Sequence, residues 1–265
     1  MSRSLAKLAG TLTKLPWFAA FVFDRDIGRD YGIGVVRKAR LLQEFRRNVR
    51  RVQTLSTVSE HLELAATILR LPRGVPGNVV ECGCFQGGSS VNISLVCELV
   101  GRRLIICDSF EGLPEPQGED VFHRVDHRDD FEQYQKGQFA SSLETVQDNL
   151  RRFGRLDVCD FKIGFFDQSM STLEGDVAMA FLDVDLIDSI KPCLTAIWPR
   201  LGEGCRVYVH DAEDLVLAGV FFDRGWWQEA IGEDAPGLVG AGSGLPLEAP
   251  QGSELGYAQR GRTGS

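Results

Sequence analysis

Polar side chains that suit metal chemistry follow two apolar runs in the second half of the chain: Asp183 follows one run, and His210 and Asp211 follow the next. Leaving ionisable groups beside apolar segments costs free energy unless a cation or a substrate uses them. We therefore predict that Asp183, His210 and Asp211 hold a divalent metal ion. Carboxylates suit Mg²⁺ or Mn²⁺, whereas a single imidazole shifts the preference toward a transition metal. Helix capping and loop hydrogen bonds are the structural alternative.

A glycine-rich segment begins at Glu81 and reads Glu-Cys-Gly-Cys-Phe-Gln-Gly-Gly-Ser-Ser. Gly83 and Gly87 let the backbone turn tightly and approach a ligand closely, as a nucleotide-like cofactor requires. Phe85 stands where a dinucleotide-binding turn needs its second glycine, which argues against a dehydrogenase. The carboxylate of Glu81 suits instead a cofactor that carries ammonium and sulfonium charges. A glycine turn that binds nothing is the structural alternative.

Asp108 ends an earlier apolar run and is followed by Ser109 and Phe110. An acid in this position can accept hydrogen bonds from both hydroxyls of an adenosyl ribose. The hydroxyl of Ser109 and the ring of Phe110 are expected to line the same pocket. Taken alone, an acid after a strand is more often a turn or cap residue. Together with the glycine-rich segment, Asp108 predicts a cofactor site built from two strand ends.

Short apolar runs separated by helical lengths must position these groups. The runs predict buried parallel strands at Val79 to Cys82, Leu104 to Cys107, Val158 to Ile163, Val177 to Leu182 and Cys205 to Val209. Helical crossovers are expected at Ser89 to Val100, Ser142 to Phe153 and Ser189 to Leu201. The predicted fold class is therefore α/β, with a doubly wound, mostly parallel Rossmann-like sheet. Ligands of such sheets bind beyond the carboxyl ends of the strands, where the candidate residues lie.

The chain divides into three predicted parts. Residues 1–71 form an N-terminal arm and helices, 72–233 the cofactor-binding catalytic core, and 234–265 a C-terminal strand with a flexible tail. The segment from Leu113 to Lys136 is long, polar and interrupted by prolines, which predicts a lid over the site. The apolar patch from Leu255 to Ala258 predicts the last strand.

Composition restricts the partners. The chain has 265 residues, of which 43% are hydrophobic, so it can bury one large core. A net charge of −8 opposes binding to nucleic acid, and the basic run from Arg46 to Arg51 indicates a solvated or subunit-facing helix face. Seven cysteines without zinc-ribbon spacing indicate reduced thiols in a cytoplasmic protein. The apolar stretch from Leu15 to Phe23 is too short to span a membrane, and together with the amphipathic helices after it favours a homo-oligomer.

Three segments together resemble the macrocin O-methyltransferase family. They are Val79 to Ser89, Cys107 to Pro116 and Phe181 to Leu186, within a similarity that spans Ser56 to Asp214. The run Asp-Ser-Phe-Glu-Gly-Leu-Pro-Glu-Pro, which begins at Asp108, is the most specific part. The resemblance implies a class I methyltransferase of natural-product biosynthesis. Such an enzyme uses S-adenosyl-L-methionine, with Mg²⁺ in studied members, to methylate a hydroxyl of a small molecule, often on a sugar.

The resemblance also implies roles for individual residues of the cofactor site. Glu81, Gly83 and Ser89 are expected at the methionine end of S-adenosylmethionine. Asp108 is expected at its ribose. Asp183 takes the first metal-ligand position in the same comparison.

The chain departs from the family after the fifth strand, where the family usually has two consecutive acids and this sequence has His210-Asp211. The expected reaction is in-line methyl transfer to an acceptor oxygen that loses its proton. His210 either ligates the metal with Asp183 or acts directly as the general base. His123 and His127 in the predicted lid are second candidates for that base.

Two rival functions use the same residues. The triplet Asp183-Val184-Asp185 is also compatible with the metal of a nucleotide sugar in a glycosyltransferase, although this leaves the glycine-rich segment without a role. A non-catalytic member that keeps the cofactor is the other rival, and His210 in place of an acid favours it. Aromatic residues in the segment 221–227 either wall an acceptor pocket or pack against the sheet.

Overall fold

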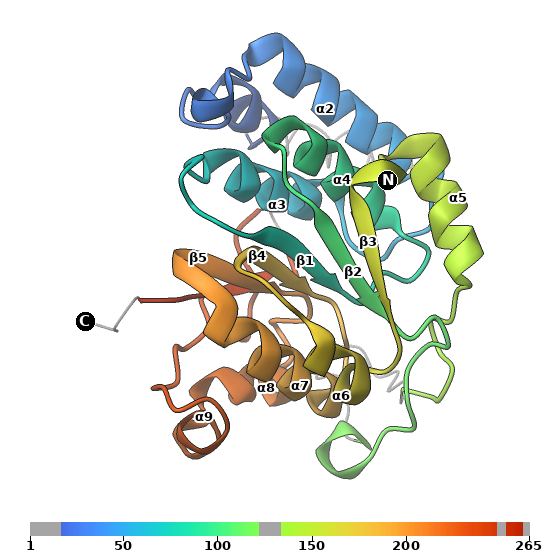
Figure 1. The fold of residues 1–265 in the computed structure, drawn as a ribbon, viewed down its shortest axis with the longest axis vertical. Helices are drawn as coiled ribbons and strands as arrows, with labels where there is room; N and C mark the ends of the chain where they lie inside the picture. The colour runs from blue at the N-terminus through green and yellow to red at the C-terminus, as the bar shows by residue number, and fades with distance from the viewer. Residues whose placement is uncertain (1–16, 122–133, 248–252, 262–265) are drawn as a thin grey trace, which may run out of the picture.

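The computed structural model describes residues 17–121, 134–247 and 253–261. Within these ranges one six-stranded sheet has the order β3-β2-β1-β4-β5-β6 (Figure 1). Its strands are β1 (Asn78–Cys82), β2 (Leu104–Asp108), β3 (Cys159–Ile163), β4 (Val177–Leu182), β5 (Leu201–Val209) and β6 (Gly256–Gln259). The first five strands pair in parallel, and β6 runs antiparallel to β5. The expected doubly wound, mostly parallel α/β fold is confirmed, including the last strand.

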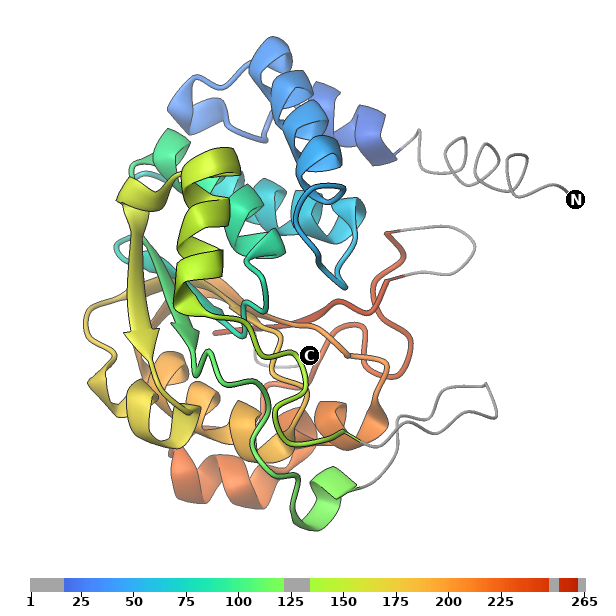
Figure 2. The same cartoon turned by 90° about the vertical axis from the view of Figure 1, so that its right-hand side faces the viewer.

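Helices cover both faces of the sheet (Figure 1, Figure 2). One face carries α2 (Val35–Asn48), α3 (Val58–Arg70), α4 (Gly88–Val100) and α5 (Leu143–Phe153). The other carries α6 (Phe166–Ser169), α7 (Ile187–Ile197), α8 (Leu215–Gly219) and α9 (Arg224–Ala230). Short 3-10 helices lie at Arg29–Tyr31, Gly118–Val121, Leu156–Val158, Met170–Thr172, Trp198–Arg200 and Val220–Phe222. The sheet is therefore the middle of three layers.

Alternate residues of each strand supply the two cores. In β1, Val79 packs with the layer of α2 to α5, whereas Val80 packs with the layer of α6 to α9. Both side chains are fully buried, and all six residues of β4 are buried as well. A parallel strand covered on both faces has no solvent-exposed side, which is why these segments read as continuous apolar runs.

The boundaries differ from the sequence-based expectation at β5 and α7. β5 begins at Leu201 rather than Cys205, because Leu201 pairs with Val177 ahead of a register irregularity with β4. α7 ends at Ile197 and passes into a 3-10 turn, in which Pro199 has no backbone N–H to continue the helix. Both differences lie at the amino end of β5, away from the strand ends that carry the candidate residues.

Only the two ends of the predicted lid are described. Residues 122–133, with His123 and His127, lie outside the described part of the chain. At the outgoing end, the buried carboxylate of Asp120 accepts hydrogen bonds from the first backbone N–H groups of α7, the nearer at 2.5 Å from the N–H of Ile187. The described residues before position 122 are therefore anchored to the start of α7. The lid itself stays a prediction, as does the division of the chain into three parts.

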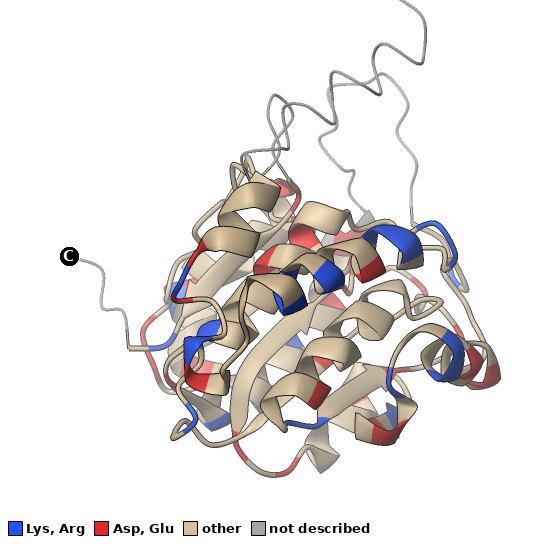
Figure 3. Cartoon of the chain, turned by 90° about the horizontal axis from the view of Figure 1, so that it is seen from above, with Lys and Arg blue, Asp and Glu red and all other residues tan. Residues whose placement is uncertain are grey.

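The surface carries charges of both signs, interspersed on the helices seen in Figure 3. In the predicted basic run, the Arg46 guanidinium lies 6.0 Å from the ring centroid of Phe18, and that of Arg51 lies 5.4 Å from Phe153. Within the described ranges no helix is long and apolar enough to cross a membrane. All seven cysteines are buried, and none forms a disulfide bond with another. The cytoplasmic location and the homo-oligomer stay predictions.

Candidate active site

A cavity of about 440 Å³ lies at the carboxyl ends of β1, β2, β4 and β5. Of the predicted site residues, it is lined by Gly83, Ser89, Asp108, Ser109, Asp183, His210 and Asp211. The remaining three, Glu81, Gly87 and Phe110, are not part of its wall. The fold thus brings the cofactor candidates and the metal candidates to a single cavity, because the strands that carry them are neighbours in the sheet.

The turn after β1 depends on glycine at position 83. Gly83 has φ +81°, and a Cβ atom there would lie 1.9 Å from the backbone oxygen of Asp183. The backbone N–H of Gly83 donates to the oxygen of Cys107, and that of Asp183 donates to the oxygen of Cys82. The ends of β1, β2 and β4 are therefore held together by backbone contacts, with no room for a side chain at the turn.

Gly87 shapes the tight turn before α4, as expected, while its predicted contact with the cofactor stays a prediction. It has φ +82°, and a Cβ there would lie 3.1 Å from a methyl carbon of Val146 on α5. Its position lets α4 begin close to α5, so it shapes the turn without facing the cavity. Gly87 is not among the residues that line the cavity.

Asp108 joins two loops through its carboxylate. One oxygen accepts a hydrogen bond from the backbone N–H of Cys84 at 2.7 Å, and the other from that of Phe110 at 2.8 Å. Each carboxylate oxygen has a second lone pair, so both can still accept from a ligand in the cavity. Phe110 itself turns away and packs against Phe161, with ring centroids 6.3 Å apart. Phe110 is not among the residues that line the cavity, and a contact between its ring and the cofactor stays a prediction.

Glu81 lies behind the cavity wall and is fully buried. One of its carboxylate oxygens accepts a hydrogen bond from the Ser90 hydroxyl at 2.5 Å, and the other has no hydrogen-bond partner. Burial raises the pKa of Glu81 to about 7. A buried acceptor without a partner costs free energy, so this oxygen is open to a hydrogen-bond donor, and the nearby Ser89 hydroxyl already acts on the same carboxyl group to lower its pKa.

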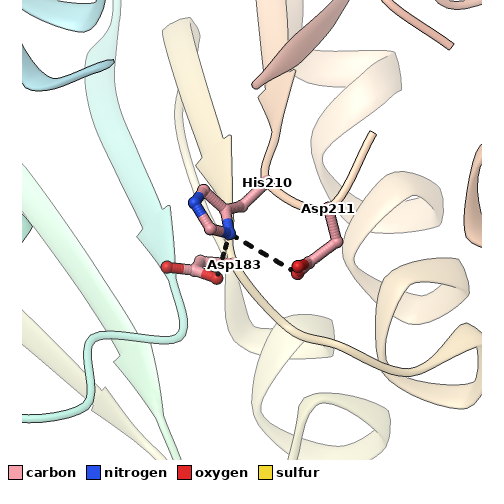
Figure 4. A group of neighbouring side chains, drawn as sticks. All are labelled: Asp183, His210 and Asp211. Atoms are coloured by element: carbon pink, nitrogen blue, oxygen red, sulfur yellow. Dashed lines mark ion pairs between the residues drawn. The ribbon is translucent and has the colours of Figure 1, made fainter. Parts of the chain in front are cut away.

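Three side chains from the ends of β4 and β5 converge as the sequence predicted (Figure 4). His210 Nδ1 lies 3.4 Å from a carboxylate oxygen of Asp183 and 3.5 Å from one of Asp211. Atoms that ligate one ion at about 2.0–2.2 Å are about 3.0–3.5 Å from one another, so these separations fit a shared cation. Burial raises the pKa of Asp183 to about 6.

The other ring nitrogen of His210 faces two further carboxylates. Nε2 lies 3.9 Å from Glu60 and 3.6 Å from Glu254. Burial opposes a charged imidazole, but the negative charges of Asp183 and Asp211 outweigh it and raise the pKa of His210 well above its ordinary value. The His210 ring is only 4% exposed, so it experiences these charges with little screening by solvent.

The sequence did not reveal several residues of this site. Glu60 comes from the first turn of α3, where the pattern Thr-x-x-Glu indicates a capping box and nothing more. Glu254 comes from the segment expected to be a flexible tail. Phe139, on the returning side of the predicted lid, packs edge-on against Phe85 at 5.9 Å. No local sequence signal could place these three residues beside the strand ends.

Backbone strain gathers around the cavity. Among the described residues, those other than glycine with positive φ are Phe85, Phe110, Phe139, Asp185 and Asp211. Four of them line the cavity, and Phe110 lies directly beside it. Left-handed backbone at residues other than glycine costs about 1–3 kcal/mol each and is typical of functional sites.

The aromatic segment 221–227 does not wall the cavity. Phe221 and Trp227 are fully buried, and Trp227 packs edge-on against Trp198 with ring centroids 4.9 Å apart. Phe221 and Trp227 thus follow the packing interpretation, whereas Phe222 is 55% exposed, and an acceptor-binding role of this segment stays a prediction. The outer wall of the cavity comes instead from residues 53–55 and 112–114, with Tyr134 and residues 138–139.

Two solved structures share this architecture. The O-methyltransferase NovP aligns with a TM-score of 0.53 at 20% identity, over 96% of this chain and 100% of that one. The calicheamicin methyltransferase CalS11 aligns with a TM-score of 0.51 at 17% identity, over 95% of this chain and 92% of that one. At this level of identity the likeness shows a common fold.

Two curated relatives match in sequence. One is the 8-demethyl-8-(2,3-dimethoxy-alpha-L-rhamnosyl)-tetracenomycin-C 4'-O-methyltransferase of Streptomyces olivaceus, 36% identical over 146 residues, which are 53% of this chain and 55% of that one. The other is the mycinamicin III 3''-O-methyltransferase of Micromonospora griseorubida, 31% identical over 159 residues, with 53% and 62% covered. The match thus spans little more than half the length of these relatives.

A family model gives the broadest match. The model for Macrocin-O-methyltransferase (TylF) matches residues 51–224. That range includes the glycine turn after β1, Asp108, and the three converging side chains Asp183, His210 and Asp211. On this match, which covers more than half of its length, the chain belongs to the macrocin O-methyltransferase family.

Proposed function

We propose that this chain is an S-adenosylmethionine-dependent O-methyltransferase that acts on a hydroxyl of a small molecule, most simply on a sugar unit of a natural product. One observation carries the proposal: a single cavity joins the glycine turn and Asp108 to the group of Asp183, His210 and Asp211. The names of the two curated relatives support the class of acceptor, since one is named for a rhamnosyl-bearing tetracenomycin and the other for mycinamicin III.

The inner half of the cavity fits the cofactor. S-adenosylmethionine supplies an electrophilic sulfonium methyl group when it is bound. The Asp108 carboxylate retains free lone pairs for two ribose hydroxyls, and Ser89 presents a hydroxyl at the start of α4. The unpartnered oxygen of Glu81 suits an ammonium group, directly or through water, and such a cation would lower the raised pKa of this carboxyl. Because Gly83 has no side chain, the cofactor can approach the backbone of the turn after β1 closely.

The part of the cavity around the ends of β4 and β5 fits the acceptor. We propose Asp183, His210 and Asp211 as the residues that hold a divalent ion there, because three ligating atoms lie at separations that fit one cation. An ion of this kind supplies positive charge that makes a nearby hydroxyl more acidic. The protein then holds the acceptor oxygen in line with the methyl group and excludes water. Direct proton removal by His210 is the second candidate role for this imidazole.

Calorimetric titration with S-adenosylhomocysteine tests the cofactor half. We expect binding by the wild-type protein, with and without Mg²⁺, and a loss of at least tenfold in Asp108→Ala. Asp108→Asn keeps one carbonyl acceptor and is the second variant if Asp108→Ala unfolds. Asp176→Ala is the matched control, because Asp176 is an exposed acid at the opposite end of the sheet, before β4. Wild-type protein that binds uridine diphosphate but no S-adenosylhomocysteine would favour the glycosyltransferase alternative.

Methyl transfer is the second measurement. Incubation with labelled S-adenosylmethionine and a panel of glycosylated acceptors, including rhamnosyl-bearing ones, should transfer label to an acceptor oxygen. Cofactor binding without transfer to any acceptor of such a panel would favour a non-catalytic member of the family.

A further inference from the structure

The orientation of the His210 ring has a physical consequence for what lies between the three side chains. Nδ1 faces the oxygens of Asp183 and Asp211 at 3.4 and 3.5 Å, while Nε2 faces Glu60 and Glu254. If the imidazole is neutral and carries its proton on Nε2, three atoms with lone pairs point at one another. Such an arrangement is repulsive unless a positive charge, either a proton or a metal ion, lies among them.

We propose that this group binds a transition-metal cation through Nδ1 of His210, in preference to Mg²⁺, and that Glu60 positions the His210 ring for that bond. The proposal rests on the ion site of the proposed function and deepens it. It names the chemical class of the cation and adds a positioning residue from α3. Its basis is the donor set and the contacts of the ring.

The donor set differs from the one that Mg²⁺ prefers. Mg²⁺ binds mainly to oxygen in near-ideal octahedra and retains several waters, whereas imidazole nitrogen suits cations such as Zn²⁺, Co²⁺, Ni²⁺ and Fe²⁺. Here one nitrogen and two carboxylate oxygens all lie within 4.8 Å of one another. The separations of 3.4 and 3.5 Å from Nδ1 are close to the value of about 3.4 Å for ligands in a tetrahedral site.

The second nitrogen of the ring supports a ligand role for the first. A histidine that binds a metal almost always directs its other N–H toward a carboxylate or carbonyl group, which fixes the tautomer. Nε2 of His210 makes no hydrogen bond in this structure, but it lies within ion-pair distance of two carboxylates, 3.9 Å from Glu60 and 3.6 Å from Glu254. The ring is also held edge-on to Phe181, with centroids 6.4 Å apart. Nδ1 is thereby left to face the cavity side.

Glu60 is rigid enough to orient the ring. Its side chain is 2% exposed, and one carboxylate oxygen accepts a hydrogen bond from the backbone N–H of Thr57 at 2.6 Å. The other oxygen accepts one from the backbone N–H of Glu254 at 2.9 Å. Glu60 therefore joins the first turn of α3 to the segment before β6, and its carboxylate lies at an ion-pair distance of 3.9 Å from Nε2 of His210, on the side opposite the two aspartates.

The experiment uses the full chain, stripped of metal with a chelator, and titrates it with Co²⁺ and with Mg²⁺ by calorimetry and visible absorption. Carboxylate sites also bind Co²⁺ more tightly than Mg²⁺, so the decisive quantity is the change in the Co²⁺-to-Mg²⁺ affinity ratio on mutation. We expect His210→Asp to lower this ratio at least tenfold. Glu60→Gln should weaken Co²⁺ binding about 10- to 100-fold, as loss of an outer partner typically does.

Glu63→Gln is the matched control for Glu60→Gln. Glu63 lies on the same helix and is also buried, but its carboxylate accepts a hydrogen bond from the Tyr208 hydroxyl at 2.8 Å. We expect Co²⁺ affinity in this control to stay within twofold of wild type. An equal effect of the two glutamate variants would overturn the positioning role of Glu60.

The wild-type protein provides a test that needs no variant. Proton NMR of the Co²⁺ form should show one strongly shifted, exchangeable imidazole N–H resonance, from Nε2 of His210. Absence of that resonance, an unchanged affinity ratio in His210→Asp, or no Co²⁺ binding at all would refute the proposal and leave a proton as the cation between the side chains. Binding of S-adenosylhomocysteine to the metal-free protein is measured in parallel, so a failed cofactor site is distinguished from a failed metal site.

Discussion

Replacement of Gly83 by alanine tests the closeness of the turn after β1 to the end of β4. An alanine at position 83 must adopt φ +81°, and its Cβ would lie 1.9 Å from the Asp183 backbone oxygen. Left-handed backbone costs an alanine about 1–2 kcal/mol, and overpacking adds about 1–3 kcal/mol. We expect Gly83→Ala to lower the free energy of unfolding by about 2–5 kcal/mol, a large share of the roughly 5–15 kcal/mol that stabilises a typical domain.

Gly101→Ala is the control that isolates the contact. Gly101 ends α4 with φ +70°, and a Cβ there would meet nothing within 4 Å. This variant should lose only the backbone contribution of about 1–2 kcal/mol. Urea unfolding, followed by circular dichroism, measures both losses, and the difference between them reports the collision with Asp183.

The same pair of variants tests the cofactor site. Moving the turn away from Asp183 displaces the two strand ends that we propose to hold S-adenosylmethionine. We therefore expect Gly83→Ala, under conditions where it stays folded, to bind S-adenosylhomocysteine at least tenfold more weakly, which is about 1.4 kcal/mol. Gly101→Ala should bind as wild type does. Equal stability losses and equal affinities in the two variants would refute the reasoning.

Three further predictions concern groups around the cavity. Glu81 has a raised pKa of about 7 in the fold, so its contribution to stability is complete below pH 4.5 and is lost as pH rises through 7. Relative to Glu81→Gln, the ligand-free wild-type protein should lose about 3 kcal/mol of unfolding free energy between pH 4.5 and pH 8, as measured by urea unfolding at each pH. Buried His61 has its pKa lowered to about 4 by burial, so the unfolded chain binds more protons and stability should fall by about 2 kcal/mol from pH 7 to pH 5, relative to His61→Gln. If the difference in unfolding free energy between wild type and variant does not change with pH in either comparison, the assigned burial is contradicted. Asp120→Ala should cost about 1–2 kcal/mol by uncapping α7, whereas Asp120→Asn should cost much less; thermal unfolding distinguishes this from a surface position, where both changes are neutral.

The features predicted best from the sequence are those that depend on the residues of one strand or of two neighbouring strands. A strand buried on both faces carries mostly apolar residues, so β1, β2 and β4 are visible as short apolar runs, with Glu81 as the fully buried exception in β1. The convergence of Asp183 with His210 and Asp211 follows from the same logic, because β4 and β5 are parallel neighbours and their carboxyl ends meet at one edge.

The parts that failed depend on tertiary placement. The cap of α7 comes from Asp120, far back in the chain, whereas a sequence-based search for caps considers only the residues just before a helix. Phe110 was expected in the pocket wall, and its ring packs instead against Phe161 from the neighbouring strand, a contact that only the sheet order brings about. Glu60 carries a recognisable capping signal, yet its contact with His210 depends on how α3 packs on the sheet.

The composition of the cavity wall has a consequence for how such a chain can diversify. The inner wall is made of strand ends and their first turns, where Gly83 has no room for a side chain beside the backbone oxygen of Asp183. The outer wall is made of connecting segments, and Leu55 within it is 63% exposed. Loops with few packing obligations tolerate exchange. Selection for a new acceptor can therefore act on exposed residues of this wall such as Leu55 while the strand ends are inherited unchanged, and a mutant library confined to such positions should retain most of its folded members.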